Sequence, residues 1–338
     1  MREELPPPGI CMVQARGLRF RFRIGGRRWG FPRRRIQFGR RVSAVSPALS
    51  PQESAPALVN VLEPGPVVRR PHTWPVLAVS GALEVRIADS DSEIEAAQRL
   101  RYRVFYEEMA AIPTPQMRTE RRDFDKYDAF CDHLLVIDRN MRDEHGEPTV
   151  VGTYRLLRGE VAALNGGFYT SSEFDLAPLL KVYPPGTRFL ELGRSCVLKS
   201  HRAKASTMQL LWRGNQLYIE RYGIEVMFGC ASFPGTDPDA LAMPLSYLHH
   251  FHRTPEAYRI RARPELYVEM NRMPKEEIDP KDALRALPTL IKGYVRVGAF
   301  IGDGAVIDRQ FSTTDVLIYF PVSRIDERWR SKFHRMGG

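Results

Sequence analysis

The apolar segment Phe189–Val197 contains two ionisable residues, Glu191 and Arg194, whose neighbours are mostly phenylalanine, leucine and valine. Charged side chains are almost never fully buried without a partner, so this predicted strand holds either an internal ion pair or a reaction centre. Positions three apart on a strand face opposite sides, and a bulge at Gly193 would return both side chains to one side. Bulges cluster next to active sites, which favours a reaction centre.

Four cysteines, Cys11, Cys131, Cys196 and Cys230, are scattered without paired spacing. This pattern disfavours both a zinc site and a disulfide framework, and a cytoplasmic location is the simplest interpretation. Cys196 lies close to the charged residues and is a candidate nucleophile. A small buried hydrophobic residue is the stronger interpretation, because free cysteine commonly lies in protein cores.

Two histidine patterns also resemble sites. His133 and Asp138 fit the His-x-x-x-x-Asp pattern of glycerolipid acyltransferases, but in an extended strand their side chains point to opposite faces. The histidine cluster 249–252 lacks a suitably spaced carboxylate or cysteine, so we predict no metal site.

Charge divides the chain of 338 residues. Residues 1–78 contain 14 Arg, no Lys and four acidic residues, whereas residues 79–338 contain equal numbers of basic and acidic residues. The net charge of +10 therefore belongs to the first segment. That segment is rich in arginine and proline and is predicted to be a disordered tail that can adhere to anionic lipid or nucleic acid. The alternative interpretations are a solvated arm without function and an extension that results from the choice of an upstream start codon. Residues 79–328 are predicted to form one catalytic domain, followed by a short C-terminal tail, 329–338. No signal peptide or membrane-spanning segment is predicted.

The body of the chain alternates between strand and helix patterns. Strands are predicted at 83–87, 133–137, 150–157, 189–197, 224–230, 267–270, 295–297 and 316–320. Helices are predicted after the Ser90/Ser92 capping region, over 208–222 and near 282–290. This order predicts an α/β (α+β) fold in which helices flank a central, mixed, twisted sheet.

The order of strand, loop and helix resembles the GNAT-type N-acyltransferases, in which a central strand and the next helix surround the pantetheine arm of the acyl donor. A helix N-terminus offers free N–H groups to a phosphate. The loop 199–207 adds three cations, Lys199, Arg202 and Lys204, but has Ala205 and Thr207 at the two glycine positions of the family pattern. The resemblance therefore implies a donor that demands less of the loop than a coenzyme A pyrophosphate does.

A closer resemblance covers residues 82–325. The motifs Arg101-x-x-x-Phe105, Asp125-x-x-Asp128, Gly152-x-x-Arg155 and Glu191-x-x-Arg194 recur in this order in the acyl-homoserine-lactone synthases. The segments 166–176, 228–233 and 290–305 resemble the bacterial ornithine lipid acyltransferases. Residues 106–117 contain no tryptophan, which disfavours a lactone synthase.

This resemblance implies transfer of a 3-hydroxyacyl chain from acyl carrier protein to the α-amine of L-ornithine, which forms lyso-ornithine lipid. The acyl chain arrives on the phosphopantetheine of the carrier, and no permanently bound cofactor is expected. Glu191 is the candidate base, Arg194 orients it or holds a carboxylate, and amides near Ser195 and Cys196 are candidate oxyanion donors. The expected substrate-binding residues are Arg101, Phe105, Asp125, Asp128 and Arg155, and a structural salt-bridge network is their alternative interpretation.

Donor binding is expected at Ser195, Cys196, Val197, Lys199, Arg202 and Lys204. Acyl carrier protein is acidic, so Arg121, Arg122 and Arg213 are expected to join the three loop cations in docking it. The alternative enzymes are a lactone synthase or another amino-acid N-acyltransferase. A membrane or nucleic-acid binding protein is the alternative of a different class; because the evidence for it is confined to the tail, we expect at most peripheral contact with an anionic membrane and no specific nucleic acid.

Overall fold

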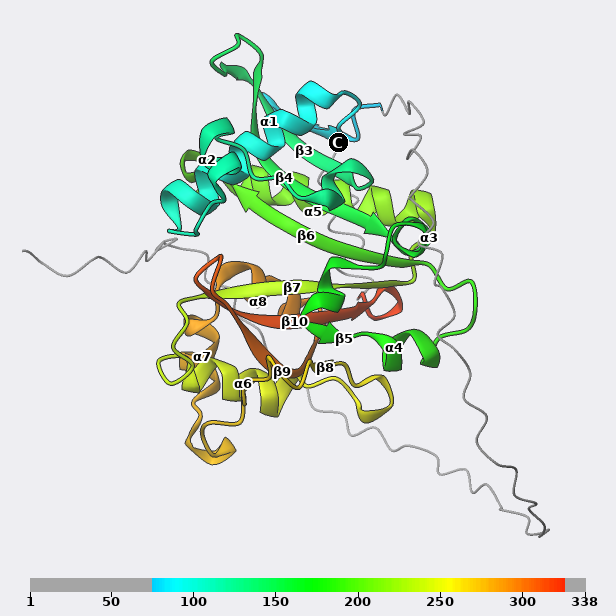
Figure 1. The fold of residues 1–338 in the computed structure, drawn as a ribbon, viewed down its shortest axis with the longest axis vertical. Helices are drawn as coiled ribbons and strands as arrows, with labels where there is room; N and C mark the ends of the chain where they lie inside the picture. Colours follow the sequence, from blue (N-terminus) through cyan, green and yellow to red (C-terminus); the bar gives the residue numbers. More distant parts are fainter. Residues whose placement is uncertain (1–74, 326–338) are drawn as a thin grey trace, which may run out of the picture. The chain divides into compact units, whose positions relative to one another are not determined.

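The computed structural model describes residues 75–325 (Figure 1). The strands are β1 (Ala78–Ser80), β2 (Leu83–Ile87), β3 (Asp132–Arg142), β4 (Pro148–Arg158), β5 (Phe174–Asp175), β6 (Phe189–Val197), β7 (Val226–Pro234), β8 (Arg261–Ala262), β9 (Phe300–Asp308) and β10 (Thr313–Pro321). The α-helices are α1 (Asp91–Tyr102), α2 (Pro115–Glu120), α3 (Gly159–Leu164), α4 (Ala177–Val182), α5 (Ala205–Tyr222), α6 (Ala242–His252), α7 (Pro280–Ala286) and α8 (Thr289–Arg296). Short helical turns are η1 (Arg103–Glu108), η2 (Lys126–Ala129), η3 (Tyr169–Ser172), η4 (Lys199–His201), η5 (Glu256–Tyr258), η6 (Lys275–Glu277) and η7 (Val322–Arg324).

The strands form one mixed sheet in the order β1-β2-β3-β4-β6-β7-β10-β9-β8-β5. Neighbouring strands in the series β1, β2, β3, β4 and β6 pair antiparallel, as do those in the series β7, β10 and β9. Strand β6 pairs with β7 in parallel, as β8 does with β9, and β5 pairs antiparallel with β8. The mixed, helix-flanked sheet predicted from the sequence is therefore confirmed.

Strands β6 and β7 pair only at their beginnings. Their register runs from Phe189 opposite Val226 to Glu191 opposite Phe228, after which no further pairing joins them. One residue further along β7, Gly229 allows a close approach of the two backbones, because a Cβ there would lie 2.2 Å from the carbonyl oxygen of Leu192. The chain thus opens its sheet beside the charged residues of β6.

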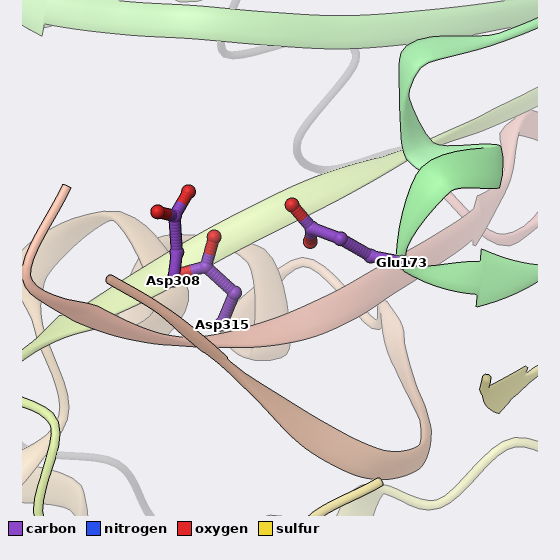
Figure 2. Close-up of side chains that lie close together, drawn as sticks. All are labelled: Glu173, Asp308 and Asp315. Atoms are coloured by element: carbon purple, nitrogen blue, oxygen red, sulfur yellow. The ribbon is translucent and has the colours of Figure 1, made fainter. Parts of the chain in front are cut away.

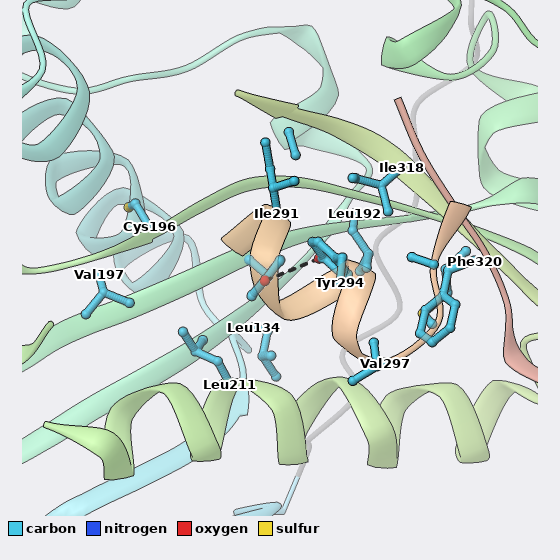
Figure 3. Packing of buried hydrophobic residues seen from close by; sticks show 14 of the residues in the cluster. Leu134, Leu192, Cys196, Val197, Leu211, Ile291, Tyr294, Val297, Ile318 and Phe320 are labelled. Carbon is cyan, nitrogen blue, oxygen red and sulfur yellow. Dashed lines mark hydrogen bonds between the residues drawn. The ribbon is translucent and has the colours of Figure 1, made fainter. Parts of the chain in front are cut away.

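Helices α1 and α5 cover the two faces of the first half of the sheet (Figure 1). Ser90 begins α1, because its hydroxyl accepts a hydrogen bond from the amide of Glu93, as the predicted cap requires. Two hydrophobic clusters lie on opposite sides of the second half: Ile318 and Phe320 of β10 belong to the first, and Leu317 and Tyr319 belong to the second. Figure 3 shows part of the first cluster, with Leu192, Tyr294 and Phe320 among its members.

Three expectations in the last third of the chain are wrong. Residues 295–297, expected as a strand, end helix α8, because Ile291, Tyr294 and Val295 recur at helical spacing and face the core. Residues 267–270 make one isolated bridge, from Val268 to Ala305, rather than a strand. The single helix expected near 282–290 is two helices, and Pro288 stands between them.

The predicted tails fall mostly outside the described residues, which exclude 1–74 and 326–338. Ala78, the last residue of the predicted N-terminal tail, begins β1. The division into a tail, a catalytic domain and a short C-terminal tail stays a prediction. Within residues 75–325, every helix is too short or too polar to cross a membrane.

Candidate active site

A cavity of about 320 Å³ occupies the opening between β6 and β7. One end of the cavity is polar and lies on the side of η3, with Glu191, Arg194 and Asp315 among its lining residues. The other end is apolar and lies on the side of α8, with Leu192 and Phe320 in its wall. The cavity therefore connects a polar face of the sheet to an apolar face.

Glu191 lies at the polar end and is only 4% exposed. Its carboxylate accepts hydrogen bonds from the backbone amides of Tyr169 at 2.9 Å and Thr170 at 2.6 Å. Burial raises the pKa of Glu191 above its ordinary value, although these hydrogen bonds oppose the shift. A fixed carboxylate with a raised pKa is suited to accept a proton in a neutral solution.

Arg194 shares the polar side with Glu191 because β6 contains a bulge. The register with β4 shifts between Thr153 and Arg155, and Arg194 itself has a φ of 50°, in the left-handed region. The predicted bulge is confirmed, with Arg194 rather than Gly193 in the left-handed conformation. The Arg194 guanidinium lies over the rings of Tyr169 and Phe311, with its central carbon 4.9 Å and 4.7 Å from their centroids.

Glu191 and Arg194 have separate partners. Arg194 donates to Asp125 at 3.0 Å and lies 3.4 Å from Asp123, whereas Glu191 is held by the η3 amides. Burial opposes ionisation of Arg194, but Asp123, Tyr169 and Asp125 raise its pKa well above the usual value. Arg194 is therefore a permanent cation beside the candidate base.

Three arginines and three aspartates form a network behind this end of the cavity. Arg101 is fully buried and donates to Asp123 at 2.7 Å and to Asp128 at 2.8 Å. Arg155 donates to Asp125 at 2.7 Å, and Arg194 completes the set. Despite burial, the Arg101 guanidinium holds the pKa of Asp128 below its usual range. Charges alternate throughout, so the network fixes Arg155 and Arg194 in place.

The predicted substrate residues divide into two groups. Phe105 and Arg155 line the cavity together with Arg194 and Glu191. Arg101, Asp125 and Asp128 belong to the network and are absent from the cavity wall. The structure therefore brings all the predicted residues into one region, in which the second group supports the first.

The predicted donor residues surround another part of the cavity. Ser195, Cys196, Val197 and Arg202 line it, and Arg202 donates to the carbonyl oxygen of Val197 at 2.9 Å. Lys199 and Lys204 are exposed on the loop that leads into α5. Arg121 and Arg122 follow α2, where they pair with Glu107 and Glu95, and Arg213 lies within α5.

At the apolar end, two tyrosines provide the polar groups. The hydroxyls of Tyr154 and Tyr294 lie 3.3 Å apart, and Tyr154 is also hydrogen-bonded to Ser195. A second cavity of about 20 Å³ shares Leu192, Met227, Tyr294 and Phe320 with the first. The apolar space therefore continues toward α5.

The other motifs are accounted for by separate contacts. Burial raises the pKa of the Cys196 thiol to about 12, so this side chain is a neutral core residue. His133 contacts the backbone oxygen of Asp128 at 3.3 Å, whereas Asp138 lies 3.0 Å from His201. His133 and Asp138 thus have different partners, consistent with their opposite orientations.

Several lining residues were not singled out from the sequence. Tyr169, Thr170 and Cys230 lie in segments that were noted only for their resemblance to ornithine lipid acyltransferases. Asp308 and Asp315 come from the β9–β10 hairpin, where no motif marks them. Asp123 lies two residues before Asp125, and its contacts with Arg101 and Arg194 become apparent only in the folded chain.

Comparisons with known proteins identify similar sequences. The family model for the acetyltransferase (GNAT) domain matches residues 100–213. The L-ornithine N(alpha)-acyltransferase of Rhizobium meliloti (strain 1021) is 53% identical over 254 residues, which cover 75% of this chain and 85% of that protein. The same enzyme of Brucella abortus (strain 2308) is 50% identical over 259 residues, covering 76% and 91%. Among solved structures, FeeM, an N-acyl amino acid synthase from uncultured soil microbes, is 11% identical with a TM-score of 0.39, covering 74% of this chain and 93% of FeeM.

The domain match and the opened mixed sheet define an acyltransferase with the GNAT fold. The identity to the curated relatives is more specific. The chain belongs to the L-ornithine N(alpha)-acyltransferase family.

Proposed function

We propose that this enzyme transfers a 3-hydroxyacyl chain from acyl carrier protein to the α-amine of L-ornithine, forming lyso-ornithine lipid in the first step of ornithine lipid synthesis. The cavity between β6 and β7 is the observation that carries this proposal, because it joins a polar end to an apolar end through the sheet. An amino acid fits the first environment and an acyl chain fits the second. The relatives' name supplies the acceptor.

The reaction joins an amine to a thioester. The amine nitrogen attacks the carbonyl carbon, the C–S bond breaks and the sulfur leaves as a thiolate, which then receives the proton lost by the amine and becomes the carrier thiol. Glu191 takes the proton that the amine loses, directly or through a water molecule. Its burial and fixed position suit this role.

Arg194 and Arg155 hold the carboxylate of the amino acid. Both line the cavity, and the aspartate network fixes both guanidinium groups. Arginine binds carboxylates well because its planar fork donates two parallel hydrogen bonds. The bulged backbone near Ser195 and Cys196 donates to the oxyanion of the tetrahedral intermediate.

The apolar end receives the acyl chain, and Lys199, Arg202 and Lys204 meet the carrier. The two lysines are exposed, whereas Arg202 lies at the cavity. Acyl carrier protein is acidic and docks through surface charge, so cations beside the opening favour it as the donor. No step of this reaction needs a permanently bound cofactor.

A competition assay tests the proposal. Purified full-length protein is incubated with 3-hydroxyacyl carrier protein and equal ornithine, lysine and S-adenosylmethionine, and the products are identified by mass spectrometry. We expect the amide on the α-nitrogen of ornithine. A homoserine lactone from S-adenosylmethionine would instead show that the enzyme is a signal synthase.

We place the enzyme in the cytoplasm, in peripheral contact with the inner face of the membrane through the arginine-rich segment 1–74. Each basic side chain near an acidic bilayer contributes about 1 kcal/mol to the free energy of membrane binding. Membrane contact also suits the reaction, because the lipid product must reach the bilayer. Protein that begins at residue 75, which keeps β1 intact, should retain turnover of soluble substrates and sediment less with phosphatidylglycerol vesicles at low salt. Equal sedimentation of the full-length and shortened proteins would contradict a role of segment 1–74 in membrane contact.

A further inference from the structure

Three carboxylates converge at the polar end of the cavity (Figure 2). Glu173 precedes β5, Asp308 ends β9 and Asp315 lies in β10, and their ligand atoms all lie within 4.8 Å of one another. Asp308 and Asp315 line the cavity. Segments far apart in sequence therefore concentrate negative charge beside the candidate base.

The described residues leave this charge without a cation. No lysine or arginine within residues 75–325 forms a salt bridge with Glu173, Asp308 or Asp315. Burial and neighbouring carboxylates raise the pKa of Glu173 to about 7. Burial likewise raises that of Asp315 to about 6. Arg194 is too far to pair with them, although its field favours their ionised forms.

One oxygen atom of the cluster also lacks a hydrogen-bond donor. Asp315 is 6% exposed. The hydroxyls of Thr313 and Ser232 favour the ionised form of its carboxyl group, but its Oδ1 has no hydrogen-bond partner in good geometry among the described residues. A buried carboxylate oxygen without a donor is costly, so its presence in a cavity wall indicates that a ligand supplies the donor. By contrast, Oδ1 of Asp308 already accepts from the amides of Gln310 and Phe311.

A continuous set of contacts connects the cluster to Glu191. Glu191 accepts from the amide of Thr170, the Cys230 thiol lies 3.8 Å from the Thr170 hydroxyl, and the same thiol lies 3.2 Å from Glu173. Glu191, Asp308 and Asp315 also line the same cavity, and Glu173 contacts Cys230 in its wall. A small molecule can place one amine at Glu191 and a second cation at the cluster.

We propose that Glu173, Asp308 and Asp315 bind the distal ammonium group of the amino-acid acceptor and select a diamino acid over a monoamino acid. This inference rests on the proposed N-acylation of ornithine. An ammonium group has three N–H donors, which match three carboxylates, and its charge offsets their mutual repulsion. Binding the distal amine here also keeps it away from the thioester, so that acylation occurs at the α-nitrogen.

The decisive comparison uses L-norvaline, which has the same carbon chain as ornithine but lacks the distal amine. A site that pairs with a buried polar group rejects an analogue without that group, so we expect wild-type kcat/KM to favour ornithine by about 100-fold or more. Asp315→Asn should reduce this preference at least tenfold, mainly by raising the KM for ornithine. Glu256→Gln, a change at an exposed carboxylate outside the cavity, should leave it unchanged.

Three outcomes would overturn the inference. Equal use of ornithine and norvaline by the wild type would overturn the role of the cluster and leave the proposed reaction intact. Failure to acylate any α-amine would instead contradict the proposed reaction. An unchanged preference in folded Asp315→Asn and in Asp308→Asn, whose partly exposed site tolerates the change, would also exclude the cluster. Stoichiometric binding of Mg²⁺ or Ca²⁺ that titration calorimetry detects in the wild type and not in Asp308→Asn would assign the carboxylates to a metal instead.

Discussion

Gly229 lies so close to Leu192 that a Cβ on the glycine would be 2.2 Å from the leucine carbonyl oxygen. This contact stands where β6 and β7 separate and where the cavity begins. Because backbone cannot move aside as a flexible side chain does, Gly229→Ala should force the strands apart. We expect a loss of about 1–3 kcal/mol in the free energy of unfolding and severe loss of turnover. Urea denaturation and the acylation assay measure these effects; wild-type stability in the variant would contradict this account.

Glu191→Gln should reduce kcat by about 10²- to 10⁴-fold, because the variant cannot accept the proton of the amine. In the wild type, kcat/KM should rise with pH as Glu191 ionises, with a midpoint above its ordinary value of 4.5. Cys196→Ala is the matched control in the same cavity and should keep turnover within a few fold. The roles would be wrong if the alanine variant were folded and inactive while the glutamine variant worked normally.

Arg101→Met should be strongly destabilising, because it leaves Asp123 and Asp128 buried without their main partner. Breaking a buried pair in this way costs about 3–5 kcal/mol. Arg121→Met is the control, since this side chain is 71% exposed and its pair with Glu107 contributes little. Thermal unfolding of both variants measures the difference, and equal melting temperatures would show that the network is dispensable for stability.

The contribution of Glu173 and Asp315 to stability should fall as pH rises from about 4 to about 7. The folded protein holds protons on Glu173 and Asp315 more tightly than the unfolded chain does, with pKa values of about 7 and 6 against ordinary values of 4.5 and 3.8. Their contribution is therefore complete below the ordinary values and is lost as pH passes through the raised ones. Glu173→Gln removes one of the two, so the slope of the unfolding free energy against pH should become more positive in this range. An unaltered slope in the variant would contradict the raised pKa of Glu173.

Reversing the charge of Lys199 and Lys204 together, to glutamate, should raise the KM for acyl carrier protein about tenfold and weaken its salt dependence. Turnover of a small acyl-pantetheine thioester should stay the same, because both lysines are exposed and absent from the cavity wall. Lys181→Glu on α4 is the control. Efficient use of free acyl coenzyme A that is insensitive to charge reversal at Arg202 and Lys204 would contradict the carrier as donor.

The sequence was sufficient to predict β2, β3, β4 and β6 and the special character of β6, but not β1. Alternating apolar residues marked the strands, and two charges among them indicated a bulge that the register shift at Arg194 confirms. The sequence predicted a strand at 295–297 because Val295 and Val297 favour strands by type, whereas the helical spacing of Ile291, Tyr294 and Val295 toward the core decided the structure.

The acidic cluster could not be predicted from the sequence. Glu173 is separated from Asp308 by more than a hundred residues, and the two meet only because β5 and the β9–β10 hairpin reach the same end of the cavity. Its electrostatic character arises from burial, which no local pattern records. Asp123 was missed for a related reason, since its partner Arg101 lies on another element.

The candidate active site lies beside the short pairing of β6 with β7, which joins the two halves of the sheet. Three register pairs join the two strands there, so hydrogen exchange of the amides around Leu190 and Met227 reports on the stability of this pairing. An acceptor that contacts Arg194 of β6 and Asp315 of β10 would connect the two halves of the sheet across this pairing. Hydrogen–deuterium exchange at these amides should therefore slow when ornithine binds.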